Sequence, residues 1–71
     1  MSDRIIPLAP LDRLIRIAGA LRVSESASEK LAEILEQIGL DISKQALAFA
    51  HHAGRSTVMS EDFDAALSIR G

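Results

Sequence analysis

The sequence contains no cysteine, tryptophan or tyrosine, and Phe49 and Phe63 are its only aromatic residues. Without cysteine the chain has neither disulfides nor thiolate metal ligands. No apolar run approaches the roughly 18 residues that cross a bilayer, and the first residues lack the pattern of a signal peptide. We therefore expect one soluble intracellular domain over residues 1–71, with no membrane partner, metal or cofactor.

Apolar residues make up 48% of this 71-residue chain, which is a large share for so small a protein. A domain of this size buries only about 60% of the surface of its unfolded chain, so an isolated protomer has marginal stability. The apolar surplus indicates that a second chain covers part of the surface.

Charge is distributed unevenly along the chain. The net charge of −2 argues at first against nucleic acid as a partner. Residues 1–22, however, carry four arginines and two aspartates, so the positive charge gathers near the N-terminus. Arginine offers a planar fork that can bind phosphate through two hydrogen bonds, which makes this end the candidate anion-binding region.

Two short amphipathic helices are predicted, one near each end of the chain. Residues 10–18 form the first, because Pro10 suits a first turn, where its missing N–H is not needed, and Gly19 ends the apolar repeat. Residues 60–69 form the second, with Ser60 as the expected N-cap and acidic residues in the first turn.

A long helix over residues 24–52 lies between them. Apolar residues recur there at spacings of three and four without a proline, and Gly39 is the single weak point. Such a helix is roughly 40 Å long, and two short helices cannot cover its apolar stripe. We expect a dimer in which a second long helix covers it, with a core of Leu31, Ile34, Leu35, Ile38 and Ile42.

Several short motifs occur along this all-α layout. They are Pro7-Leu-Ala-Pro10 with Arg13, Ala18-Gly-Ala20 followed by Arg22-Val-Ser24, Leu31-Ala-x-x-Leu-Glu36 with Gly39, and His52-Ala-Gly-Arg-x-Thr57 followed by Glu61-Asp62. Each alone is a weak signal. In this order and spacing they resemble the archaeal histones and, more distantly, the eukaryotic core histones, over nearly the whole chain.

The resemblance implies a histone fold that exists as an obligate handshake dimer and binds double-stranded DNA without reading its sequence. It implies that Arg22 enters the minor groove beside Thr57 of the partner protomer, and that Arg13 and Arg16 contact phosphates. Arg55 and Ser56, next to Thr57 in the second loop, are also expected near DNA.

The resemblance further implies how dimers associate. Phe49, His52 and Asp62 match positions through which two dimers join in a four-helix bundle, and Arg55 and Asp62 match an ion pair inside one chain. We therefore expect homodimers that assemble into tetramers or longer stacks, on DNA in the cytoplasm, as part of the nucleoid. Another histone of the same cell is an alternative partner.

The sequence departs from the family where positive charge is usual. Ser56, Met59, Ala48 and His51 replace basic residues, and Leu21 replaces a charged one. Each lost phosphate contact lowers affinity and salt dependence. The alternative function is therefore a histone-fold interaction module with weak or no DNA binding, in which Leu21 and Met59 mark a partner surface.

Less specific interpretations stand beside these assignments. Arg16 is spaced to pair with Asp12, four residues earlier, and could be an ordinary surface residue with Arg13. Adjacent histidines His51 and His52 diverge by about 100° on a helix, so a metal site is not expected. No acid–base pair, nucleophile or phosphate-binding loop is apparent, and the chain is not expected to be an enzyme or to bind a small-molecule substrate.

Overall fold

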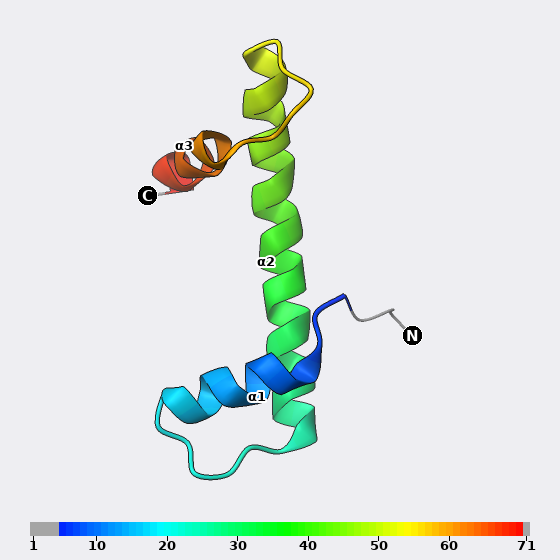
Figure 1. Cartoon of the computed structure of the whole chain (residues 1–71), viewed down its shortest axis with the longest axis vertical. Coiled ribbons are helices and arrows are strands. Elements are labelled where there is room, and N and C mark those ends of the chain that lie inside the picture. Colours follow the sequence, from blue (N-terminus) through cyan, green and yellow to red (C-terminus); the bar gives the residue numbers. More distant parts are fainter. Residues whose placement is uncertain (1–4, 71) are drawn as a thin grey trace. The chain divides into compact units, whose positions relative to one another are not determined.

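A computed structural model describes residues 5–70 of the chain, with only the backbone of Arg70. These residues form three helices and no strand: α1 (Leu8–Ile17), α2 (Glu25–His52) and α3 (Ser60–Arg70) (Figure 1). The chain divides into two compact units, Met1–Gln37 and Ile38–Gly71, and α2 contributes to both. None of the helices in the described part is long and apolar enough to cross a membrane.

In the first unit, α1 begins at Leu8, two residues before the predicted start. Pro7 is the N-cap, with an extended backbone (φ −65°, ψ 152°), and Pro10 lies third in the helix. The difference arises because every N–H of the first turn lacks an intrahelical acceptor, so proline fits at the third position as well as the first. Gly19 follows the helix at φ 123°, a conformation that side chains with a Cβ rarely adopt.

Side-chain and backbone caps fix both ends of α2. At its start, the Ser24 hydroxyl accepts a hydrogen bond from the N–H of Ala27 at 3.1 Å. At its end, Gly54 adopts φ 74° and donates its N–H to His51 O at 2.9 Å, while the N–H of Arg55 reaches Ala50 O at 2.9 Å. This pair of bonds is a Schellman motif, and it turns the chain out of the helix.

The carboxylate of Asp62 caps α3. Ser60, the expected N-cap, is already helical, and Met59 precedes the helix. Oδ2 of Asp62 accepts the N–H of Met59 at 2.7 Å, and the N–H of Asp62 donates to Met59 O at 3.0 Å. The prediction for Ser60 was therefore wrong, because an acidic residue three positions into the helix supplies the cap by reaching back.

The N-terminal segment is tied to α2 within the first unit. Oε2 of Glu36 accepts the N–H groups of Ile5 at 3.0 Å and Ile6 at 3.1 Å. The carboxylate thus satisfies two successive backbone donors that precede α1 and would otherwise have only water as a partner.

Small side chains form most of the interior. Apart from Leu11, at 5% exposure, the buried apolar residues of the described chain are four alanines at 0%: Ala32, Ala46, Ala50 and Ala66. No large side chain among the described residues is fully buried. Of the predicted dimer core, Ile34 and Ile38 remain 44% and 47% exposed, and Leu31, Leu35 and Ile42 are half-buried. A single chain therefore leaves its large aliphatic groups partly in contact with water.

Candidate functional site

Three arginines occupy α1 and the loop that follows it. Arg13 and Arg16 are exposed on α1, and Arg22 is exposed in the loop. Nε of Arg16 donates to Oδ2 of Asp12 at 2.9 Å, and its Nη1 donates to the carbonyl of Leu21 at 3.0 Å. The pairing of Arg16 with Asp12 therefore occurs. Because the two side chains are 50% and 37% exposed, solvent screens the pair and its stabilisation is small.

The bonds of Arg16 also have a positional effect. One guanidinium joins a carboxylate of α1 to a backbone carbonyl of the loop, directly before Arg22. Arg22 itself forms no ion pair with any residue in the described range. Leu21, its neighbour, is 90% exposed, the largest exposure among the large apolar residues of the described chain. The loop therefore presents one cation and one aliphatic group to solvent.

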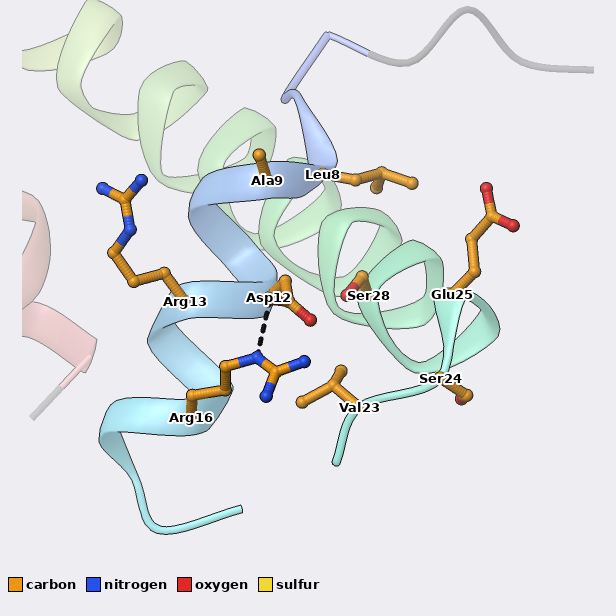
Figure 2. Close-up of a pocket in the computed structure, with 9 residues that line it drawn as sticks. All are labelled: Leu8, Ala9, Asp12, Arg13, Arg16, Val23, Ser24, Glu25 and Ser28. Atoms are coloured by element: carbon orange, nitrogen blue, oxygen red, sulfur yellow. Dashed lines mark hydrogen bonds and ion pairs between the residues drawn. The ribbon is translucent and has the colours of Figure 1, made fainter. Parts of the chain in front are cut away.

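An open hollow of about 570 Å³ lies between α1 and the start of α2 (Figure 2). Its lining consists of Leu8, Ala9, Asp12, Arg13, Arg16, Val23, Ser24, Glu25 and Ser28. Figure 2 shows Arg13 extending away from the Asp12–Arg16 pair, on the side opposite Glu25. The positive end of the α2 dipole lies at Ser24, so this region combines two guanidinium groups with a helix N-terminus, partly offset by two carboxylates.

An ion pair organises the second loop. Nη2 of Arg55 binds Oδ1 of Asp62 at 2.8 Å, and Nη1 binds Oδ2 at 3.0 Å. Nη1 also donates to the carbonyl of Thr57 at 2.9 Å, and Glu61 lies 3.6 Å from Nη2. The side chain of Arg55 is 27% exposed and that of Asp62 only 3%. Arg55 thus closes the loop onto the first turn of α3.

The same contacts govern the protonation of Asp62. Hydrogen bonds from Arg55, followed by the backbone N–H of Met59, lower the pKa of Asp62 to about 2, although burial opposes the shift. The hydrogen bond to Asp62 likewise raises the pKa of Arg55. The prediction assigned Arg55 both to this pair and to DNA. The geometry shows the pair, and the side chains of Ser56 and Thr57 beside it are exposed, as are those of Val58 and Met59.

A small apolar pocket of about 200 Å³ lies between the end of α2 and α3, lined by Gln45, Ala48, Phe49, His52 and Ile69. Phe49 and His52 were expected at an interface between dimers, whereas Gln45 and Ile69 were not. Gln45 continues the three-four spacing of Ile38 and Ile42, and that signal could have identified it. Ile69 is 67% exposed, and only the packing of α3 brings it to this pocket. No group of three potential metal ligands occurs within residues 5–70.

A short, a long and a short helix, joined by an arginine-bearing loop and an ion-paired loop, define a histone-fold protein. The sequence profile of the family described as histone-like transcription factor (CBF/NF-Y) and archaeal histone matches residues 4–67, and the chain belongs to this family. Both the histone fold and the family resemblance predicted from the sequence are thereby confirmed. Members are DNA-binding architectural proteins, and the chain is accordingly not an enzyme.

Two relatives illustrate the similarity. One of the subunits of the archaeal histone HAN1 from Thermococcus zilligii is 58% identical over 57 residues, which cover 80% of this chain and 85% of the relative. Probable archaeal histone 3 of Methanocaldococcus jannaschii is 48% identical over 62 residues, covering 87% of this chain and 92% of the relative. The match therefore extends over nearly the full length of each relative.

Proposed function

We propose that two copies of this chain form a handshake dimer that binds double-stranded DNA without sequence specificity and compacts it. The observation that carries this proposal is the family match over residues 4–67, together with a relative 58% identical that is named as part of an archaeal histone. The proposed place of action is the nucleoid.

The burial pattern supports the dimer. A stable single-chain domain buries large aliphatic groups, whereas here alanines fill the interior and Ile34 and Ile38 stay almost half exposed. Full burial of one isoleucine is worth about 1.5–3 kcal/mol, so a second α2 lying on this stripe gains a large stabilisation. Leu31, Leu35 and Ile42 complete the proposed dimer core.

The DNA site is proposed at paired loops of the two chains. Arg22 of one chain enters the minor groove beside Thr57 of the partner protomer, with Arg55 and Ser56 next to it, and Arg13 and Arg16 bind phosphates between the loops. The exposure of Arg13 and Arg22 supports this assignment, since neither is enclosed by the fold. Such contacts depend on backbone charge and groove width and not on base identity.

Association of dimers is proposed at the C-terminal end of α2, through Phe49 and His52, with Asp62 as the third residue that the family resemblance indicates. Tetramers or longer stacks built in this way would bring successive dimers together along DNA. A second histone of the same cell can replace one copy wherever its surface fits.

A second candidate function is a histone-fold interaction module with weak or no DNA binding. It is favoured by the net charge of −2 and by Leu21 at 90% and Met59 at 45% exposure, where the family usually has charged residues. Apolar side chains at a DNA-facing loop contribute no phosphate contact, and they suit a protein partner better.

The two functions can be separated by adding the protein to a fluorescently labelled DNA duplex of random sequence and measuring fluorescence anisotropy at two salt concentrations. Binding with a steep salt dependence is expected, and Arg22→Ala removes one cation per chain, so the slope of log affinity against log salt falls by about two units per dimer. Lys30→Ala is the matched control, because Lys30 is exposed on α2, pairs with Glu33 and is assigned no DNA contact. Absence of binding at low salt, or equal losses in both variants, would favour the interaction module.

A further inference from the structure

The carboxylate of Glu36 joins the segment before α1 to α2. Its Oε2 accepts the N–H of Ile5 at 3.0 Å and the N–H of Ile6 at 3.1 Å. Glu36 is half-buried, and hydrogen bonds to an ionised acceptor are about twice as strong as those between neutral groups. The proposed function assigns this residue no role, although it ends the motif Leu31-Ala-x-x-Leu-Glu36.

The connection between these two bonds and α1 is short and stiff. Ile6 precedes Pro7, and a residue before proline is largely confined to extended conformations. Pro7, the N-cap of α1, has its φ fixed by the ring, at −65° here, and makes no side-chain hydrogen bond to the first turn. Because Ile6 and Pro7 have so little freedom, the position of the tied backbone determines where α1 begins and in which direction it runs.

Within one chain, few other contacts fix the position of α1. Leu11 is the only buried residue of this helix, and the others are exposed or half-buried. One buried side chain defines a point of contact but leaves the helix free to pivot about it. A second attachment at the Glu36 carboxylate restricts this motion, and it thereby fixes the positions of Arg13 and Arg16, which are exposed on α1.

We infer that Glu36 is a positioning residue for DNA binding, which holds α1 where Arg13 and Arg16 meet the phosphates. This inference rests on the proposed function and adds an acidic residue to its DNA-binding machinery. A protein that holds its binding conformation only part of the time has an affinity reduced in proportion to that population. Glu36 thus strengthens binding to a polyanion although its own charge repels one.

The opposite effects of charge and position make the inference testable. Glu36→Ala and Glu36→Gln each remove one negative charge per chain, but glutamine keeps a side-chain oxygen that can accept two hydrogen bonds. Glu33→Ala is the matched control, because Glu33 is an exposed glutamate of the same helix that pairs with Lys30. Alanine has the highest helix propensity, so neither alanine variant is expected to weaken α2.

Anisotropy titrations of the labelled duplex with each full-length variant, at one low salt concentration, compare the DNA affinities. Relief of repulsion is expected to leave Glu33→Ala and Glu36→Gln at least at wild-type affinity. Glu36→Ala is expected to bind about three- to tenfold more weakly, since both hydrogen bonds to the segment before α1 are lost. Equal affinities of Glu36→Ala and Glu33→Ala, or an equal loss in both Glu36 variants, overturn the inference and leave DNA binding standing. A wild-type protein that does not bind at low salt overturns the proposed function and the inference with it.

Amide hydrogen exchange, followed by NMR without DNA, measures the two hydrogen bonds directly. The amides of Ile5 and Ile6 are expected to exchange more slowly in wild type and Glu36→Gln than in Glu36→Ala, because a bonded amide exchanges only when its bond opens. Circular dichroism and sedimentation velocity check that each variant keeps the helix content and the dimer of wild type. Equal exchange rates of these amides in wild type and Glu36→Ala overturn the inference independently of DNA binding.

Discussion

Replacing Ile38 by alanine is expected to weaken the dimer more strongly than it destabilises the fold of the single chain. Ile38 lies on the apolar stripe of α2 and is 47% exposed in one chain. Full burial of isoleucine is worth about 1.5–3 kcal/mol, so covering the exposed half contributes roughly 0.7–1.4 kcal/mol per chain. A dimer contains the residue twice, which gives about 1.5–3 kcal/mol and a dissociation constant raised roughly 10- to 100-fold.

The control for this prediction is Leu40→Ala on the same helix. Leu40 is 54% exposed, close to Ile38 in exposure and size, but two residues further on it points about 200° away around the helix axis. Its truncation is expected to change dimer affinity by less than about threefold, because substitutions outside an interface rarely exceed about 0.5 kcal/mol.

Urea unfolding, followed by circular dichroism at several protein concentrations, measures both effects. For a dimer that unfolds to monomers, the midpoint rises with concentration, and the dissociation constant follows from the fit. Equal losses for Ile38→Ala and Leu40→Ala, or a midpoint that is independent of concentration, would refute the reasoning from burial.

Two further predictions concern the ends of the helices. The pKa of Asp62 is lowered from 3.8 to about 2. Its ionised form therefore contributes fully to stability above the ordinary pKa, and this contribution is lost as the pH falls toward 2. Between these two pH values, the thermal unfolding temperature of the wild type is expected to depend more on pH than that of Asp62→Asn. Equal pH dependence of the two proteins would contradict the ion-pair argument. Ser24→Ala removes the bond to the N–H of Ala27 and is expected to cost about 1 kcal/mol per chain in urea unfolding, whereas Ser43→Ala, an exposed position within α2, is expected to cost nothing measurable.

The order and type of the helices were predictable from the sequence because their signals are local. Apolar spacing marks α2 along its whole length, and Gly19 and Gly54 interrupt the pattern where the backbone adopts φ of 123° and 74°. The start of α1 was harder to predict from the sequence, because proline is compatible with each position of a first turn. The cap of α3 was missed because Met59 offers no side-chain acceptor, which hides the contribution of Asp62.

The candidate sites were predictable only in part, because they depend on side-chain packing. Family resemblance indicated the Arg55–Asp62 pair, but not that the same guanidinium also binds the carbonyl of Thr57. Gln45 lies on the same three-four spacing as Ile38 and Ile42, but only the packing of α3 shows that it lines a pocket together with Ile69.

The four fully buried alanines have a consequence for the lifetime of the protein in the cell. An unpaired chain whose interior consists mainly of alanine side chains has low stability until it dimerises. Proteases cleave a protein in proportion to the population of its unfolded state. Because the partner is a second copy of the same chain, degradation is expected to remove the protein mainly at low concentration, where most chains are unpaired. The lifetime of the protein is then expected to rise with its abundance.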